Sequence, residues 1–187
     1  MRIISGYLKG RLITVPQSKF IRPTTDRVRE TLFNILNNKI DFENIRVLDL
    51  YSGSGSLGIE CISRGAESVS FIEKNKLIYF NLIENLKILG IENKCEVIRA
   101  DAVTFTKKHS TLKYDLILAD PPFFEFDIYD VLKNVIRNNL LTKNGLMIIE
   151  RSIQTKEKDI KEFSTEPFRI IGDACLYEIT NLNKKDL

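Results

Sequence analysis

Residues 47–58 read Val47-Leu48-Asp49-Leu50-Tyr51-Ser52-Gly53-Ser54-Gly55-Ser56-Leu57-Gly58. An apolar run containing one acid is typical of a buried strand, and the glycines that follow it form the pattern G-x-G-x-x-G. Glycine tolerates positive φ and lets the amides at a helix N-terminus approach a ligand closely. The stretch therefore predicts a strand, a ligand-binding turn and a helix, but by itself it does not select the ligand.

The alternation of strand and helix continues on the C-terminal side of this stretch. Short apolar runs predict strands at residues 45–50, 68–72, 95–98, 116–119, 146–149, 168–171 and 176–179. Helical spacing of apolar residues predicts helices at 57–64, 77–89 and 128–140. This rhythm is typical of an α/β fold with helices on both faces of a parallel sheet. The tight turn Gly172-Asp173 makes the last two strands antiparallel. We therefore expect a Rossmann-like, seven-stranded, mostly parallel sheet with an antiparallel C-terminal strand.

On the N-terminal side, strand-like pieces at residues 2–5 and 11–15 flank a turn bounded by glycines, which predicts a β-hairpin. A helix then begins near Asp26, where Thr24 or Thr25 caps the first turn. Its predicted buried face consists of Val28, Leu32, Ile35 and Leu36. We expect two parts: residues 1–40, a projecting basic hairpin with a docking helix, and residues 41–187, the ligand-binding domain.

Composition limits the class of protein. The chain has 187 residues, 43% of them hydrophobic, which is enough to bury the core of one domain. The net charge is only +3, and residues 1–29 hold seven basic side chains against the single acid Asp26. Three separated cysteines and one histidine, His109, indicate neither disulfides nor a metal site. No apolar run reaches the ~20 residues of a membrane span, and we expect a cytoplasmic protein that does not bind membranes.

Acidic residues next to three of the predicted strands favour a cationic ligand. Glu73 ends the second strand, where it can accept hydrogen bonds from two ribose hydroxyls. Asp49 precedes the glycine turn and can attract an ammonium group; Asp101 follows the third strand and can accept from an adenine amine while the Ala102 amide donates to the ring. These acids suit S-adenosylmethionine better than a dinucleotide with its pyrophosphate. The open alternatives are an ordinary loop aspartate at 101 and a tight packing turn beside a solvated acid at 73.

A second motif ends the fourth predicted strand. Residues 114–123 read Tyr114-Asp115-Leu116-Ile117-Leu118-Ala119-Asp120-Pro121-Pro122-Phe123. The two prolines fix φ and hold the Asp120 carboxylate and the Pro121 carbonyl as rigid acceptors. Two acceptors on the hydrogens of a planar amine pull its nitrogen towards tetrahedral geometry and direct the lone pair at a methyl donor. We predict a catalytic corner of Asp120, Pro121, Pro122 and Phe123, with Phe123 stacked on the base; the open alternative is a plain Pro-Pro turn.

Together these motifs resemble the class I S-adenosylmethionine-dependent methyltransferases, and within them the RsmD-type 16S ribosomal RNA guanine-N2-methyltransferases of bacteria. The resemblance rests on residues 2–6, 10–11, 22–33, 49–58, 63–66 and 120–123, of which 22–33 are the most specific. The sequence departs from the family at Ser52 and Ser56, where alanines are expected. The resemblance implies direct methyl transfer from S-adenosylmethionine to the N2 amine of one guanine in 16S rRNA, within an assembled or assembling 30S subunit.

The motifs define a predicted cofactor site residue by residue. Its members are Asp49, Tyr51, Ser52, Gly53, Ser54, Gly55, Gly58, Glu73, Lys74, Asp101 and Ala102. Thr24 and Arg27 are added because they resemble the segment that, in related amino-methyltransferases, closes over the methionine end of the cofactor. No metal is expected.

The N-terminal basic residues are the predicted RNA contacts. Lysine and arginine neutralise phosphates, and interleaved aromatic rings stack on unpaired bases. The candidates are Tyr7, Lys9, Arg11, Lys19, Phe20 and Arg22. A merely solvated basic hairpin is the open alternative, and we expect a monomer.

Two other functions stay open. A DNA adenine-N6 methyltransferase has a similar Asp-Pro-Pro-aromatic corner, although 187 residues leave no room for the target-recognition domain that such enzymes usually add. A non-catalytic RNA-binding factor for ribosome assembly is the alternative of another class.

Overall fold

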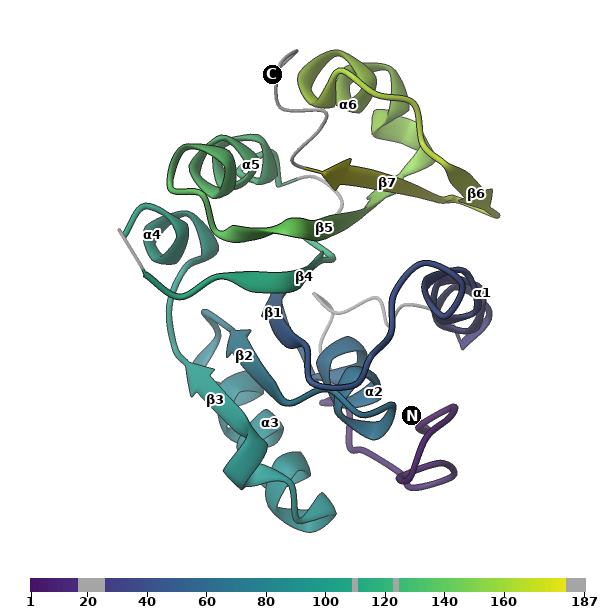
Figure 1. Ribbon diagram of the computed structural model, residues 1–187, viewed down its shortest axis with the longest axis vertical. Helices are drawn as coiled ribbons and strands as arrows, with labels where there is room; N and C mark the ends of the chain where they lie inside the picture. The colour runs from purple at the N-terminus through teal and green to yellow at the C-terminus, as the bar shows by residue number, and fades with distance from the viewer. Residues whose placement is uncertain (17–25, 109–110, 123–124, 181–187) are drawn as a thin grey trace.

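The computed structural model describes residues 1–16, 26–108, 111–122 and 125–180 (Figure 1). Within them the chain forms a seven-stranded sheet in the order β3-β2-β1-β4-β5-β7-β6. The strands are β1 (Arg46–Leu50), β2 (Ser68–Ile72), β3 (Cys95–Ile98), β4 (Tyr114–Ala119), β5 (Leu141–Ser152), β6 (Arg169–Ile171) and β7 (Ala174–Thr180). The first five are parallel to one another, whereas β7 is antiparallel to both β5 and β6. The predicted Rossmann-like sheet is confirmed.

Helices cover both faces of this sheet. They are α1 (Asp26–Leu36), α2 (Ser56–Ser63), α3 (Lys76–Leu89), α4 (Ala102–Thr106), α5 (Ile128–Arg137) and α6 (Lys156–Phe163), with the short 3-10 helices η1 (Glu92–Lys94) and η2 (Ile153–Thr155). Successive residues of β1 enter different hydrophobic clusters, Val47 with α1, α2 and α3, and Leu48 with α5. Figure 1 shows the same two groups of helices on opposite sides of the sheet. In the described ranges, no helix is long and apolar enough to cross a membrane.

The connections create a switch in strand order beside β1. From β1 the chain runs outward through β2 to β3 and then returns to β4, on the other side of β1. Ligands of open α/β sheets bind at the carboxyl ends of the strands at such a point. Leu50 pairs with both Ile72 and Ala119, so the residues that follow these three strands lie together at one end of the sheet.

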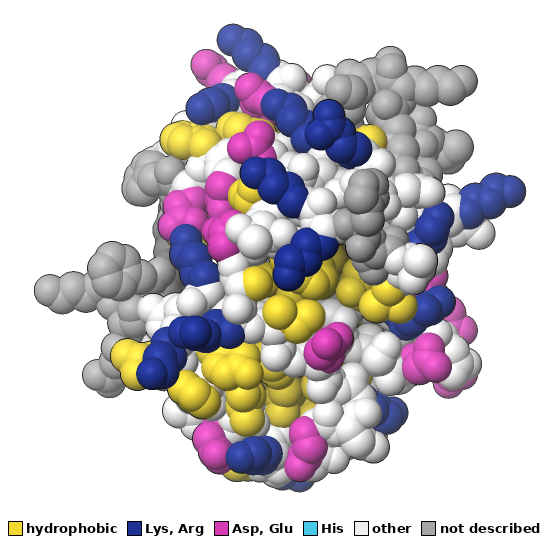
Figure 2. Space-filling model, turned by 90° about the vertical axis from the view of Figure 1, so that its left-hand side faces the viewer, with side chains coloured by type: hydrophobic (Ala, Val, Ile, Leu, Met, Phe, Trp, Pro, Cys, Tyr) yellow, Lys and Arg dark blue, Asp and Glu magenta, His cyan; other side chains and the backbone are white. Residues whose placement is uncertain are grey.

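Strand β3 forms one edge of the sheet and is incompletely covered. Its four residues are exposed or half-buried, whereas the last four residues of β1 and of β2 are buried. Figure 2 views this side of the molecule and shows hydrophobic side chains gathered in its lower half. Leu77, Phe80 and Ile88 of the adjacent α3 are each more than half exposed. This side therefore presents an apolar surface next to the sheet edge.

Several elements differ from the prediction. Strand β5 continues to Ser152 because β7 pairs with its second half as far as the register Ser152↔Ala174. The last residues of β5 are polar yet buried, which hides the strand from a hydrophobic pattern. Helices α4 and α6, of five and eight residues, are too short for a clear apolar repeat and were not predicted. The predicted helix at 128–140 ends earlier, at Arg137.

Helix α1 is described from Asp26 onward, and its predicted cap at Thr24 or Thr25 falls outside the described residues. Of its predicted buried face, Val28, Leu32 and Leu36 are buried. Ile35 is only half-buried, and Arg29 is buried instead, with 1% of its surface exposed. Arg29 Nη2 donates to the Arg2 carbonyl at 2.9 Å and pairs with Asp26 at 2.7 Å. The helix therefore contacts the first residues of the chain through an arginine as well as through the shared hydrophobic cluster.

The predicted N-terminal hairpin is present, but it does not project from the protein. Within the described part of the chain, its two pieces are joined by the antiparallel bridge Arg2↔Leu12 and by backbone hydrogen bonds of Met1 and Ile3 with Gly10, Arg11 and Ile13. Ile3, Leu8 and Ile13 are buried in the same hydrophobic cluster as Val47 of β1. The segment therefore packs on the body of the protein, and the domain boundary at residue 40 stays a prediction.

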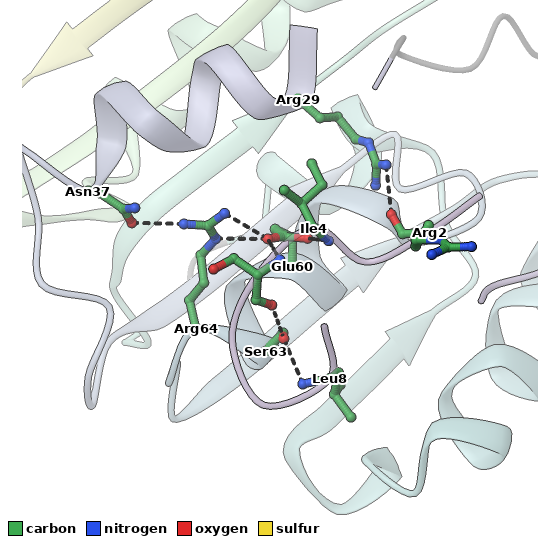
Figure 3. A network of polar contacts seen from close by, with 9 residues as sticks. Arg2, Ile4, Leu8, Arg29, Asn37, Glu60, Ser63 and Arg64 are labelled. Atoms are coloured by element: carbon green, nitrogen blue, oxygen red, sulfur yellow. Dashed lines mark hydrogen bonds and ion pairs between the residues drawn. The ribbon is translucent and has the colours of Figure 1, made fainter. Parts of the chain in front are cut away.

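The N-terminal segment docks on the C-terminal end of α2 (Figure 3). Glu60 is fully buried, and its carboxylate accepts hydrogen bonds from the amides of Ile4 at 2.8 Å and Ser5 at 3.0 Å. Arg64 balances the charge of Glu60 with an ion pair of 2.8 Å. These amides have no partner strand, so the buried carboxylate replaces the hydrogen bonds that a sheet would supply.

Ser63, the last residue of α2, holds the turn of the N-terminal segment. Its carbonyl accepts from the Tyr7 amide at 2.9 Å and its Oγ accepts from the Leu8 amide at 3.0 Å. Gly6 lies at φ +78°, and a Cβ on it would meet the Ser63 carbonyl oxygen at 1.7 Å. The contact therefore requires glycine at position 6.

The docking contact can be tested with two alanine substitutions in the same turn. Gly6 and Gly10 have φ of +78° and +86°, but a Cβ on Gly10 has no neighbour within 4 Å. Gly10→Ala should cost only the backbone strain, about 1–2 kcal/mol. Gly6→Ala should cost a further amount of about 1–3 kcal/mol through overpacking. Urea unfolding measures both; equal losses would show that Ser63 does not hold the turn.

Candidate active site

The glycine turn joins β1 to α2 at the carboxyl end of β1. Gly53 and Gly55 have φ of 56° and 84°, so both need the conformational freedom of glycine. Gly58 serves a different purpose, because a Cβ there would lie 2.4 Å from the Phe71 ring of β2. Two of the predicted glycines therefore shape the turn, and the third lets α2 approach the sheet.

Ser52 and Ser54 of the glycine turn form hydrogen bonds within the protein. Ser52 is buried, and its hydroxyl donates to the carbonyl of Asp49 at 2.6 Å and lies 3.1 Å from that of Ile72. The carbonyl of Ser54 accepts from Asn85 of α3 at 3.1 Å. The departure from the expected alanine at position 52 therefore ties the turn to β1 and β2.

Asp49 is a buried acid at the centre of the predicted cofactor site. It is 2% exposed, and its Oδ2 accepts from the Gly58 amide at 2.9 Å. Burial raises the pKa of Asp49 well above its usual range; the Gly58 amide lowers it, and the nearby Asp120 and Glu73 raise it further. Among the described residues no lysine or arginine forms an ion pair with it. The carboxyl group therefore favours a ligand with positive charge.

Glu73 lies at the end of β2 and is fixed by the backbone. Its Oε2 accepts from the Gly53 amide at 3.0 Å and its Oε1 from the Asn75 amide at 2.7 Å. Each carboxylate oxygen can accept a second hydrogen bond. Glu73 is therefore held beside the glycine turn in the position predicted for a ribose-binding acid.

Three residues predicted to bind the cofactor make contacts within the protein. They are Asp101, Ala102 and Lys74. Asp101 caps α4, and its Oδ1 accepts from the Thr104 amide at 3.0 Å, while Ala102 is the first residue of that helix. Lys74 Nζ lies 2.8 and 2.9 Å from the two carboxylate oxygens of Glu125, so this ion pair joins the segment after β2 to the loop after β4. Their contacts with a cofactor stay predictions.

The Asp-Pro-Pro corner follows β4 directly. Asp120 is half-buried and Pro121 is buried, whereas Pro122 is exposed. The Glu125 amide donates to the Pro122 carbonyl at 3.0 Å and closes a turn after the prolines. Since Asp120 lies near enough to Asp49 to raise its pKa, the structure brings the two motifs together. Phe123 lies outside the described residues.

Tyr51 lies in the turn with φ of 60°. Its hydroxyl and the Oδ1 of Asp127 face each other, yet both are buried without a hydrogen bond of normal geometry. Burial raises the pKa of both groups. Such unsatisfied polar atoms are rare in folded proteins and occur at ligand sites.

The remaining predicted residues lie at the periphery or outside the described ranges. Arg27, Tyr7, Lys9 and Arg11 are exposed. Thr24, Lys19, Phe20 and Arg22 fall in the undescribed range 17–25. Just before that range, Thr14 and Ser54 both bond to Asn85, so the chain leaves the N-terminal segment beside the glycine turn.

Three polar residues near the corner were not predicted. Glu125 and Asp127 follow the two prolines closely, and Arg151 lies near the end of β5. The signal for Arg151 was the polar run Glu150-Arg151-Ser152 directly after an apolar strand. In the described residues, no group of three His, Cys, Asp or Glu side chains is placed to hold a metal.

Asp49 gives a prediction about stability. An unfolded aspartate ionises near pH ~3.9. Because the folded pKa is higher, ionisation favours the unfolded chain, and stability is lost as the pH rises from about 4 towards the folded pKa. Asp49→Asn keeps an acceptor for Gly58 and removes this loss. It should be at least as stable as the parent at pH 7, with the difference shrinking towards pH 4.

Urea unfolding across this pH range checks the prediction, with the exposed Asp130→Asn on α5 as control. A variant that is less stable than the parent at pH 7 would show that the Asp49 carboxylate stabilises the fold.

Comparison with known proteins places the chain in a family. The family model described as Conserved hypothetical protein 95 matches residues 1–179. Ribosomal RNA small subunit methyltransferase D of Buchnera aphidicola subsp. Baizongia pistaciae is 41% identical over 151 residues, which cover 81% of this chain and 76% of that protein. The protein of that name from Escherichia coli K12 is 36% identical over 154 residues, 82% and 76% of the two chains. Putative rRNA methyltransferase YlbH of Bacillus subtilis is 34% identical over 182 residues, 93% and 97% of the two chains.

Solved structures agree with this assignment. A putative methyltransferase from Escherichia coli has a TM-score of 0.79 and 30% identity, covering 96% of this chain and 98% of that chain. A hypothetical protein from Thermus thermophilus has a TM-score of 0.81 and 25% identity, covering 96% and 99%. The chain therefore belongs to the Conserved hypothetical protein 95 family, together with the ribosomal RNA small subunit methyltransferase D proteins that it matches.

Proposed function

We propose that this protein transfers a methyl group from S-adenosylmethionine to the N2 amine of one guanine in 16S rRNA. One observation supports this most directly: a buried carboxyl without a cationic partner, Asp49, faces both Glu73 and the Asp120 corner. The names of the relatives indicate ribosomal RNA of the small subunit, and the resemblance of the motifs adds the guanine N2. An assembled or assembling 30S subunit as substrate, a monomeric enzyme and a cytoplasmic location belong to the same proposal.

The residues present suit S-adenosylmethionine. Asp49 would attract its positively charged methionine end, and Glu73 has acceptors left for ribose hydroxyls. The buried hydroxyl of Tyr51, which faces Asp127, lies at the same turn. When bound, this cofactor supplies a methyl group on a sulfonium, which needs no further activation. The task of the protein is to align the amine and to exclude water.

Asp120 and Pro121 would orient the amine. The Asp120 carboxylate and the Pro121 carbonyl accept its hydrogens and turn the nitrogen lone pair away from the ring. The proton leaves through Asp120 or water after the methyl group has moved. Positioning of this kind contributes up to about 7–11 kcal/mol in the best cases. The guanine must be unpaired or flipped out of its stack, since N2 in a stacked pair cannot reach the methyl group.

The RNA contacts are a separate part of the proposal. Tyr7, Lys9 and Arg11 are exposed, so they are accessible to a phosphate or a base. Tyr7 lies next to Ser63, and the Arg11 side chain donates to the Ile88 carbonyl of α3, whereas the glycine turn lies at the other end of α2. Contact at both places requires an RNA larger than a nucleotide.

Asp120 provides the test of the catalytic corner. Asp120→Ala should lower methyl transfer by about 10²-fold or more, because the amine loses an orienting acceptor. Binding of S-adenosylmethionine, measured by calorimetry, should stay unchanged or improve, because a like charge near Asp49 is gone. Asp130→Ala on the exposed side of α5 is the control. Near-normal turnover by Asp120→Ala would remove the corner from the mechanism.

The substrate is tested by transfer of labelled methyl groups to 30S particles, naked 16S rRNA and DNA, followed by nucleoside analysis. We expect N2-methylguanosine, with 30S particles as the preferred substrate. N6-methyladenine in DNA would support the adenine methyltransferase instead. RNA binding without any transfer would support the non-catalytic assembly factor.

A further inference from the structure

A buried ion pair lies behind the loop that follows the Asp-Pro-Pro corner. Arg151, near the end of β5, and Asp159, in α6, are both fully buried, and Arg151 Nε lies 3.2 Å from Asp159 Oδ1. Arg151 Nη1 donates to the carbonyl of Glu125 at 3.2 Å. The arginine therefore connects the end of β5 to the backbone of the loop between β4 and α5.

Asp159 is itself fixed by hydroxyl groups from two other elements. Tyr129 of α5 donates to its Oδ1 at 2.7 Å, and Thr155 of η2 donates to its Oδ2 at 2.6 Å. Both bonds are short, as expected for donors to a carboxylate. The carboxylate therefore has one orientation, and it fixes the guanidinium in turn.

The loop is attached to this pair at neighbouring residues. Glu125, which accepts from Arg151, also closes the turn onto the Pro122 carbonyl. The ring of the next residue, Phe126, has its centroid 5.9 Å from the guanidinium carbon of Arg151 and stacks on Tyr129 at 6.0 Å. A shift of Arg151 or Tyr129 would therefore move the backbone that follows Pro122.

Stability alone does not explain this arrangement. Apolar residues of similar volume usually stabilise a core as well as a buried ion pair does. Arg151 Nη2 is also buried without a hydrogen-bond partner, which is unfavourable. The Arg151 guanidinium donates a hydrogen bond that fixes the direction of the Glu125 carbonyl. An apolar side chain could not donate this bond.

We propose that Arg151 and Asp159 are positioning residues, which hold Glu125 and Phe126 and through them the Asp120-Pro121-Pro122 corner. The inference rests on the proposed methyl transfer. It predicts that loosening the pair lowers kcat, because the acceptors lose their alignment. The affinity for S-adenosylmethionine should fall less than kcat, because Asp49 and Glu73 lie on other strands, although Lys74 and Tyr51 face Glu125 and Asp127 of the loop.

Two tyrosines of one aromatic cluster offer a matched pair of variants. The rings of Tyr129 and Tyr177 both pack on Phe163, at 5.5 and 5.0 Å, but the Tyr177 hydroxyl has no hydrogen-bond partner. Tyr129→Phe should lower kcat several-fold, whereas Tyr177→Phe should leave it at the parent value. Each assay includes the affinity for S-adenosylmethionine and the urea midpoint.

A double variant separates positioning from stability. Arg151→Met/Asp159→Leu removes both buried charges together, so the protein should remain folded. Its kcat should fall by about tenfold to 10²-fold, the size expected for a misplaced reacting group. Its affinity for S-adenosylmethionine should fall less than its kcat.

Parental kcat in a folded double variant would overturn the positioning role while leaving the proposed function intact. Equal losses in Tyr129→Phe and Tyr177→Phe, or a loss of cofactor affinity in step with kcat, would also overturn it in favour of a merely structural role. If the parent protein transfers no methyl group to any of the three nucleic acids, the proposed function fails and this inference with it.

Discussion

The hydrogen bond from the Gly58 amide to the Asp49 carboxylate joins strand β1 to helix α2 at the centre of the protein. It forms because Gly58 has no side chain, so that α2 can lie against Phe71 of the sheet. The close approach leaves a short turn, in which Gly53 and Gly55 adopt positive φ. The direction of α2, the shape of the turn and the position of the carboxylate all depend on this one contact.

Buried acids in this protein differ in what balances their charge. Glu60 has Arg64 and two backbone amides as partners, and Asp159 has Arg151 and two hydroxyls. Asp49 has one backbone amide and two acidic neighbours, so burial leaves it with a raised pKa. The first two acids stabilise contacts within the chain. In the proposed function, the positive charge of the cofactor supplies the partner that Asp49 lacks among the described residues.

The parts of the fold that could be predicted from sequence are those in which buried apolar residues form a run or recur at regular spacing along the chain. Strands β1, β2 and β4 read as apolar runs, and the glycine turn reads as a motif, so the sheet and the positions of Asp49, Glu73 and Asp120 were predicted. The docking of residues 1–16 was not, because it depends on Glu60 and Ser63, which bond to residues more than fifty positions away in the chain. The role of Arg151 was not predicted either, because it depends on tertiary contacts. Its partners are Glu125, in a loop, and Asp159, in a short helix.

Helix α2 sets a distance that bears on the substrate. Its first turn belongs to the predicted cofactor site, and its last residue, Ser63, holds the turn that contains Tyr7. Eight residues of α-helix are about 12 Å long. An RNA that contacts both the turn at Ser63 and the glycine turn must therefore span about the length of this helix. The modest net charge of +3 points the same way, since binding that depends on few charges needs a target with a defined shape.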